Sequence, residues 1–217
     1  DYSDFGRYLS PKLGLMLKFP TLPCCSLLAN MSSAYRAPTF NDLYWPEDSY
    51  TRGNPGLKPE TASGYDLTLM LGEPLLPGAA FSSTVFSNSL SNLIQWQSGD
   101  DFIWSPSNIG KAHIMGIENS LLFTPHINRS SIRLSHTYID SRDKTPGSDV
   151  ISNQLIYRPE HQLKLSANLD LSPIQAHFHY AVYGKQYADR ENRVEVSDYQ
   201  MLSSTLSYTA GVGGVIL

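Results

Sequence analysis

Long runs of alternating apolar and polar residues constrain the fold of this chain more than any other feature of its sequence. Between residues 162 and 171, every second residue is apolar: Leu163, Leu165, Ala167, Leu169 and Leu171. The same period of two recurs within residues 13–19, 65–71, 132–138, 176–182 and 202–208. Successive side chains of a β-strand point to opposite faces, whereas helices repeat their apolar residues every three or four positions. The sequence therefore predicts an all-β chain whose strands have one apolar and one polar face.

The alternation predicts about nine strands. They lie near residues 9–19, 26–37, 62–72, 79–97, 109–124, 129–142, 161–172, 174–188 and 199–210, and the stretch 81–96 alternates least clearly. Several of these runs have about ten residues or more, whereas strands of soluble proteins usually have about five or six. A tilted strand that crosses a membrane needs about 9–11 residues. The lengths favour an antiparallel transmembrane β-barrel over a soluble sandwich.

The connections between the predicted strands alternate between short and long. The short ones are residues 20–25, 72–78, 125–128, 172–173 and 211–214, and the long ones are 37–61, 98–108, 142–160 and 189–198. Outer-membrane barrels have short periplasmic turns and long extracellular loops. Aromatic residues near both ends of the strands, such as Phe19 and Phe123 beside short turns and Tyr35 and Tyr138 beside long loops, are typical of interfacial girdles.

Composition excludes several other classes of protein. The net charge of −4 argues against a nucleic-acid binder, which would show a basic stripe. Two cysteines are too few for a disulfide scaffold, and 41% apolar residues are too many for a disordered chain. The most apolar stretch, residues 13–29, is interrupted by Lys18, Pro20 and Pro23, so it predicts neither a transmembrane helix nor a signal peptide.

Several motifs, in a consistent order, resemble TonB-dependent outer-membrane receptors, and in particular their cobalamin and siderophore branch. Residues 33–46 read Ser-Ala-Tyr-Arg-Ala-Pro-Thr-Phe-Asn-Asp-Leu-Tyr-Trp-Pro, and residues 52–60 read Arg-Gly-Asn-Pro-Gly-Leu-Lys-Pro-Glu. Shorter motifs follow at residues 91–94, 108–112, 116–118, 138–142 and 157–159. The resemblance covers about residues 9–210 and is carried by the order of the motifs rather than by any one of them.

The resemblance implies uptake of a scarce, bulky ligand, such as a ferric siderophore or cobalamin, through a plugged barrel of about 22 strands. It also implies contact with outer-membrane lipid and energy from the TonB complex, transmitted through the plug. At about 24 residues per strand and connection, 22 strands need about 530 residues. Residues 1–217 are therefore expected to be part of the barrel domain, from its later portion, without the plug and without the terminal aromatic strand.

Two groups of residues are candidates for function. Aromatic residues in the long loops could contact a ligand, because their rings give a large contact area with few rotors; they are Tyr44, Trp45, Tyr50 and Trp104. Packing within the loops explains them at least as well. The motif residues are expected to shape the ends of strands rather than to bind; they are Arg36, Pro38, Asn54, Pro55, Pro59 and Glu60.

Other chemistry has weaker support in the sequence. His177 and His179 share one strand face and could hold a metal, but no third ligand is evident, so no metal site or cofactor is expected. Cys24 and Cys25 are expected to be free thiols at a short turn rather than a strained vicinal disulfide. No Gly-x-Ser-x-Gly or His-Glu-x-x-His motif is present, so the chain is not expected to be an enzyme.

Two alternatives to a TonB-dependent transporter stay open from the sequence. One is a passive porin-like or adhesive outer-membrane barrel, which would have no plug. The other is a soluble secreted β-protein that binds carbohydrate, which would stay monodisperse in buffer without detergent.

Overall fold

The computed structural model describes residues 5–99, 101–125 and 129–209. Most of the predicted turn at 125–128, the predicted turn at 211–214 and the C-terminal residues lie outside this part of the chain. The elements are β1 (Lys12–Phe19), β2 (Leu22–Arg36), α1 (Phe40–Tyr44), β3 (Glu60–Leu71), β4 (Ala79–Ser98), β5 (Trp104–Phe123), β6 (Ser131–Asp143), β7 (His161–Leu171), β8 (Ile174–Tyr183), β9 (Gln186–Tyr187), β10 (Glu195–Val196) and β11 (Tyr199–Tyr208).

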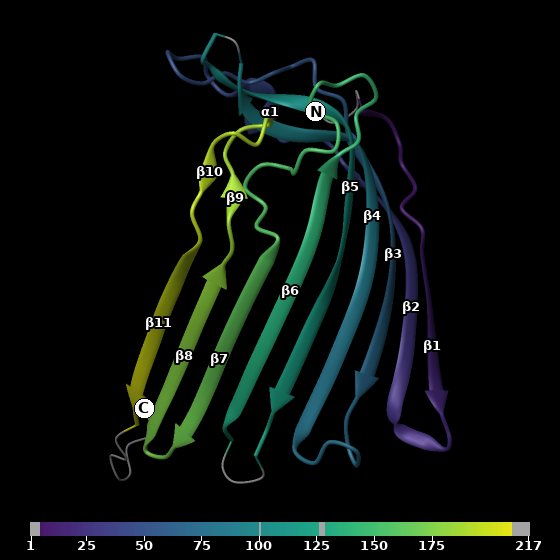
Figure 1. Ribbon diagram of the computed structural model, residues 1–217, viewed down its shortest axis with the longest axis vertical. Coiled ribbons are helices and arrows are strands. Elements are labelled where there is room, and N and C mark those ends of the chain that lie inside the picture. The colour runs from purple at the N-terminus through teal and green to yellow at the C-terminus, as the bar shows by residue number, and fades with distance from the viewer. Residues whose placement is uncertain (1–4, 100, 126–128, 210–217) are drawn as a thin grey trace, which may run out of the picture.

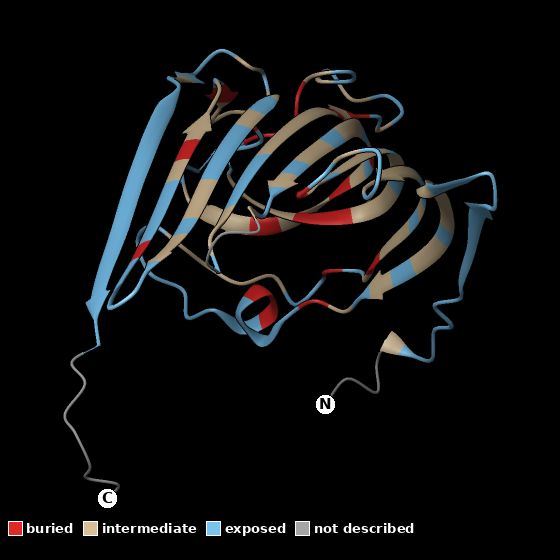
Figure 2. Ribbon diagram, turned by 90° about the horizontal axis from the view of Figure 1, so that it is seen from below, coloured by how far each residue is buried: buried red, intermediate tan, exposed pale blue. Residues whose placement is uncertain are grey.

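Nine strands form one antiparallel sheet in the order β1-β2-β3-β4-β5-β6-β7-β8-β11. Every strand pairs with its neighbour along the chain, except that β9 and β10 form a separate ribbon and leave β11 to pair with β8. The sheet bends into an arc, and α1 lies across the open side of that arc (Figures 1 and 2). The predicted all-β meander is confirmed, and the described strands do not close into a barrel: β1 and β11 are its edges.

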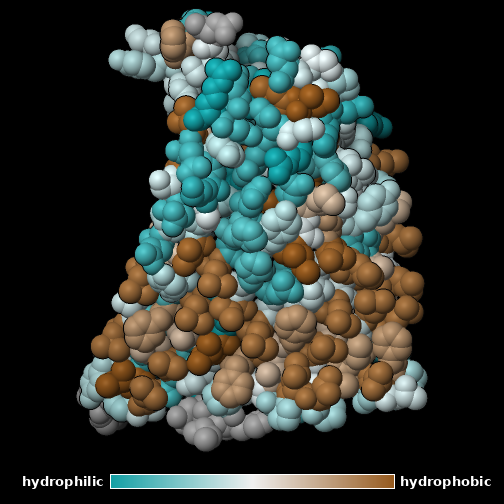
Figure 3. Space-filling view, in the orientation of Figure 1, coloured by the Kyte–Doolittle hydropathy of each residue, from teal (hydrophilic) through white to brown (hydrophobic). Residues whose placement is uncertain are grey.

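The strand register places the predicted apolar residues on one face of the sheet. Leu13 pairs with Met31, Met31 with Tyr65, and Leu67 with Val85, and the same face continues across the sheet. Large exposed apolar side chains on this face include Leu15, Leu17, Leu121, Phe123, Ile132, Leu134, Leu163, Leu165, Leu171, Ile174, Phe178, Leu202 and Leu206. Apolar residues gather over the half of the molecule near the short turns, and polar residues over the other half (Figure 3). Such an exposed apolar band is what a lipid-facing sheet requires.

Short turns and long loops lie at opposite ends of the sheet, as predicted (Figure 1). At one end β1 and β2 are separated by residues 20–21, and β7 and β8 by residues 172–173. At the other end, here called the long-loop end, β2 and β3 are joined by residues 37–59, and β6 and β7 by residues 144–160.

Several predicted boundaries were wrong. β2 begins at Leu22, so Cys24 and Cys25 lie within this strand rather than in a turn; both are free. The predicted strand 174–188 ends at Tyr183, because the chain turns away to form the β9–β10 ribbon. The predicted long loop at residues 98–108 is mostly strand, because β4 and β5 continue their pairing as far as Ser98 and Trp104.

Buried apolar residues cluster at the long-loop end rather than along the sheet. One cluster joins Leu93, Ile109 and Ala112 of β4 and β5 to Leu155. The other joins Leu43 and Leu57 to Ile94. The loops at this end therefore have a small core of their own, which fixes them to the two longest strands.

Within the described ranges, no helix has the length and apolar character needed to cross a membrane.

Candidate functional site

Residues 37–59 fold back on the sheet through the short helix α1. Thr39 caps this helix: its Oγ1 accepts a hydrogen bond from Asp42 N at 3.1 Å, and Asp42 Oδ2 accepts one from Thr39 N at 2.9 Å. This reciprocal capping box satisfies donors that a helix N-terminus leaves unpaired. The preceding Pro38 is fully buried, and the helix ends before Trp45, whose conformation is restricted by the following Pro46.

Arg36, Glu60 and Asp42 form an ionic network where the 37–59 loop leaves and rejoins the sheet. Arg36 ends β2 and donates to Glu60, the first residue of β3, through Nε at 2.6 Å and Nη2 at 2.8 Å. Glu60 Oε1 also accepts from Ile94 N at 2.6 Å. The hydrogen bond that Arg36 donates to Glu60 raises the pKa of Arg36. The network ties β2, β3 and β4 together at the rim of the sheet.

Asp42 is a buried carboxylate that links α1 to β4. Its Oδ1 accepts from Trp96 Nε1 at 3.0 Å, and its Oδ2 lies 4.0 Å from Arg36 Nη1. Burial raises the pKa of Asp42. Hydrogen bonds from Thr39 and Trp96 and the charge of Arg36 lower it, and their combined effect is the larger one, so the pKa lies below the ordinary value of 3.8. Asp42 therefore stays ionised as an acceptor at neutral pH.

Asparagine side chains hold the rest of the 37–59 loop against β4 and β5. Asn54 Nδ2 donates to Pro106 O at 3.0 Å, and its Oδ1 accepts from Gly56 N at 3.0 Å across the turn that contains Pro55. Asn108 donates to Lys58 O at 2.8 Å and accepts from Lys58 N at 2.8 Å. Beside it, Asn92 Nδ2 donates to Pro59 O at 3.4 Å. Asn54 and Pro59 of the motif thus make contacts within the fold.

The loop also pairs with the outer tip of β4 and β5. Thr51 and Trp104 form a parallel β-bridge, with Trp104 N donating to Tyr50 O at 2.7 Å and Arg52 N donating to Trp104 O at 3.0 Å. Gly53 is needed at the same crossing, because an added Cβ would lie 2.5 Å from Trp45 N. Residues 37–59 and the outer parts of β4 and β5, residues 93–99 and 101–108, thus form one body, here called the first loop unit.

The four aromatic candidates all lie on the first loop unit, in different environments. Trp45 packs edge-on against Trp96, with ring centroids 6.2 Å apart. Tyr44 and Tyr50 are 61% and 75% exposed. Trp104 begins β5 rather than lying in a loop, and it is partly buried. The structure brings the four to one end of the sheet but not into one pocket.

A second loop unit forms from residues 144–160 and 184–198. Asn192 Oδ1 accepts from Gln154 N at 2.8 Å, and Asn192 Nδ2 donates to Gln154 O at 3.0 Å. Tyr157 N donates to Tyr187 O at 2.8 Å, and Arg190 Nη2 lies 3.0 Å from Asp143 Oδ2. Two loops that are distant in the sequence therefore behave as one body.

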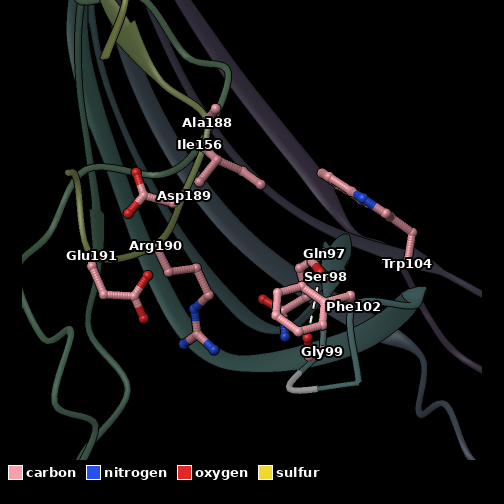
Figure 4. A pocket seen from close by; sticks show the side chains of 10 residues that line it. All are labelled: Gln97, Ser98, Gly99, Phe102, Trp104, Ile156, Ala188, Asp189, Arg190 and Glu191. Atoms are coloured by element: carbon pink, nitrogen blue, oxygen red, sulfur yellow. Dashed lines mark hydrogen bonds between the residues drawn. The ribbon is translucent and has the colours of Figure 1, made fainter. Parts of the chain in front are cut away.

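A cleft of about 480 Å³ opens between the two loop units. One wall comes from Gln97, Ser98, Gly99, Phe102 and Trp104, and the other from Ile156 and residues 188–191 (Figure 4). The units also meet through Leu155, which belongs to one apolar cluster with Leu93 and Ile109. The cleft combines aromatic and charged side chains at the long-loop end, so it is the candidate ligand site.

Of the aromatic candidates, Trp104 lines this cleft; Tyr44, Trp45 and Tyr50 do not. Sequence reasoning missed Phe102, which is 85% exposed and has a left-handed φ of 61° at the tip of the β4–β5 hairpin. The Ser98-Gly99 dipeptide was a signal for a tight turn there. It also missed Arg190, whose position depends on the pairing of two distant loops and has no local signal.

The histidine pair lies on the polar face of β8, away from the cleft. His177 Nδ1 is 2.7 Å from Asn168 Oδ1, and His179 Nδ1 is 3.0 Å from Ser166 Oγ. Across residues 5–99, 101–125 and 129–209, no group of three or more metal-ligating side chains comes together. Neighbouring polar side chains on β7 account for both rings.

Known proteins share this sequence pattern and this fold. The family model described as "TonB dependent receptor-like, beta-barrel" matches residues 1–215. The vitamin B12 transporter BtuB of Photobacterium profundum is 31% identical over 187 residues, which cover 83% of this chain and 28% of that protein. BtuB of Vibrio vulnificus is 35% identical over 152 residues, covering 70% of this chain and 23% of that protein.

Solved structures of receptors have the same arrangement of strands. The copper transporter OprC superposes with a TM-score of 0.66 at 16% identity, over 93% of this chain and 31% of OprC. The ferric citrate transporter FecA gives a TM-score of 0.66 at 16% identity, over 94% of this chain and 31% of FecA. The chain thus spans about a quarter to a third of these proteins. It belongs to the family of TonB-dependent receptors, whose β-barrels lie in the outer membrane of Gram-negative bacteria.

Proposed function

We propose that this chain supplies part of the barrel wall and part of the ligand-binding rim of a TonB-dependent uptake receptor. The ligand is a scarce, bulky molecule of the kind that the names of its relatives describe: vitamin B12 or a ferric chelate. The relatives are transporters rather than enzymes. The chain contributes binding and a path through the membrane, not covalent chemistry.

The cleft between the two loop units carries this proposal. It opens at the long-loop end, which faces outward in barrels of this class, and its walls are fixed by the asparagine contacts and the ionic network described above. A volume of about 480 Å³ lies within the range of about 300–1,000 Å³ typical of small-molecule sites. Tyr44, Trp45 and Tyr50 on the same rim would extend the contact area of a ligand larger than the cleft.

The other partners follow from the same arrangement. The exposed apolar face of the sheet contacts outer-membrane lipid. The TonB complex supplies energy by acting on a plug inside the barrel, because the outer membrane has no energy source of its own. The polar face of β6, β7, β8 and β11 then lines the interior through which the ligand passes.

Growth that depends on one supplied ligand tests the proposal. Cells that rely on the outer-membrane protein containing these 217 residues are grown with cobalamin, ferric citrate or a ferric siderophore as the sole source of the nutrient. We expect growth on one of them, and loss of that growth when TonB is deleted. Growth that persists without TonB would indicate a passive pore instead. Growth on none of them would count against uptake.

Solubility distinguishes an outer-membrane barrel from the remaining alternative, a soluble secreted β-protein. A secreted carbohydrate-binding protein would stay monodisperse in buffer without detergent. We expect this chain to require detergent or lipid, because its exposed apolar band would otherwise aggregate.

A further inference from the structure

The cations beside the cleft are already neutralised by carboxylates. Arg190 is the cation that lines the cleft, and it is held by Asp143, whose side chain is only 5% exposed. Arg52, on the tip of the first loop unit, lies 2.9 Å from Asp101. Arg158 and Arg193 are on the outer loops but do not line the cleft. An anionic ligand entering here would have to compete with carboxylates that are already in place.

The other charged side chains on the cleft wall are negative. Asp189 and Glu191 flank Arg190 (Figure 4). Asp189 accepts hydrogen bonds from the backbone amides of Arg193 and Val194, at 3.0 Å and 2.6 Å, which hold its carboxylate at the edge of the turn. Glu191 is exposed. With Arg190 offset by Asp143, the wall attracts cations and N–H donors and repels polyanions.

The opposite wall is aromatic. Phe102 is 85% exposed, and its left-handed backbone, with φ of 61°, sets it at the outermost turn of the hairpin. A phenylalanine held in this conformation stores backbone strain, which native folds keep mainly at functional positions. Trp104 continues the apolar lining on this wall, and Ile156 adds apolar surface to the wall that carries Asp189 and Glu191.

We infer that this cleft takes a bulky ligand whose contacting face carries no net negative charge and offers amide N–H donors beside apolar surface. A polyanionic ferric chelate does not fit it. The inference rests on the proposed uptake function and narrows its ligand class: uncharged, amide-bearing ligands are bound, and catecholate or carboxylate chelates with several negative charges are rejected.

Binding of three probes tests this inference. Cyanocobalamin and ferrichrome are bulky, amide-bearing and uncharged, whereas ferric enterobactin is a polyanion. Quenching of tryptophan fluorescence is measured in the detergent-solubilised outer-membrane protein that contains this chain. We expect one of the uncharged probes to bind with an affinity that changes less than about twofold between low and physiological salt. Ferric enterobactin should show no saturable binding.

A charge reversal supplies the matched comparison. We expect Glu191→Lys to give saturable binding of ferric enterobactin at low salt, where the unmodified protein shows none, and this binding should disappear at high salt. Asp149→Lys makes a similar reversal on an exposed residue of the second loop unit outside the cleft, and it should give no saturable binding of ferric enterobactin.

The outcomes distinguish the inferred ligand class from the proposed uptake function. Tight binding of ferric enterobactin to the unmodified protein, weakened by salt, would overturn the ligand class while leaving uptake intact. Equal effects of the two reversals would show that the cleft does not contact the ligand. Failure of both uncharged probes to bind would overturn the ligand class, whereas only loss of growth on every supplied nutrient would overturn the uptake function.

Discussion

At the scale of single residues, the ion pairs at the rim differ in how much they contribute to the free energy of unfolding. Glu60 is 8% exposed and satisfies both Arg36 and Ile94 N, so Arg36→Ala leaves a buried carboxylate with one amide partner. Because Arg36 is itself half-exposed, we expect a loss of about 1–3 kcal/mol in the free energy of unfolding. Urea titration in detergent measures it.

Arg52→Ala is the control for this loss. Arg52 and Asp101 are 42% and 44% exposed, so removing the pair should cost less than about 1 kcal/mol. A similar loss in both variants would contradict a special role for the Arg36–Glu60 pair.

The Asp42 carboxylate predicts a response to acid. Its pKa in the folded protein lies below the ordinary value of 3.8, so its contribution to stability is complete above that value and is lost as the pH falls through the folded pKa. We expect the near-ultraviolet circular dichroism of the Trp45–Trp96 pair to stay constant down to about pH 4 and to fall below it. Asp42→Asn should weaken the signal at neutral pH and remove this pH dependence. A wild-type transition above about pH 5 would contradict the assignment.

At the scale of elements, Gly116 of β5 is a point of close strand packing. A Cβ there would meet the carbonyl oxygen of Tyr138 and lie 2.8 Å from Phe86 Cζ. Gly116→Ala should therefore destabilise the sheet by about 1–3 kcal/mol, since backbone cannot move aside. Gly64→Ala in β3 meets the end of the flexible Asn88 side chain instead and should cost less. Thermal unfolding measures the midpoint of each variant. Equal midpoints for Gly116→Ala and Gly64→Ala would contradict the close packing at Gly116.

The second loop unit depends on Asn192, which has a left-handed φ of 57°. Asn192→Gly keeps this conformation but removes both hydrogen bonds to Gln154, whereas Asn192→Asp keeps the acceptor. We expect amide hydrogens of residues 154–157 to exchange faster in the glycine variant, by a factor of about ten for about 1.4 kcal/mol of lost contact, and to change less in the aspartate variant. Unchanged exchange in both would mean that the two loops are not coupled here.

Much of the sheet could be predicted from the local alternation of apolar and polar residues. The rest depends on contacts between residues distant in the sequence and could not be predicted. The faces of β1, β3, β7, β8 and β11 follow from residues two apart, and the register confirms them. Alternation could not show that β5 begins at Trp104 rather than near residue 109, because this outer pairing is supported by Thr51 and Asn54 from another loop. The cleft was beyond prediction for the same reason: Phe102 and Arg190 are brought near each other by two separately folded loop units.

At the scale of the whole molecule, the two sheet edges determine whether the polypeptide can fold stably in a membrane by itself. All described residues of β1 and β11 are exposed, and their outer backbone groups have no partner strand within the described chain. In hydrocarbon, each unpaired group costs several kcal/mol. We expect residues 1–217 made alone to remain sensitive to protease in lipid vesicles.

A chimera supplies the comparison for this prediction. When the same residues replace the matching segment of a BtuB relative, we expect a protease-resistant barrel whose electrophoretic mobility shifts on heating. Protection of the 217-residue polypeptide by itself would contradict the role of the open edges.

The asparagine contacts that fuse the loops also bear on how tightly a rare nutrient can be held. Freezing flexible loops around a ligand costs about 0.5–1.5 kcal/mol for each side chain that becomes ordered. In this rim, Asn54, Asn108 and Asn192 impose that order during folding, before any ligand arrives. The conformational entropy is lost in advance, so more of the contact energy remains as affinity and the ligand dissociates slowly, which suits capture from a dilute environment.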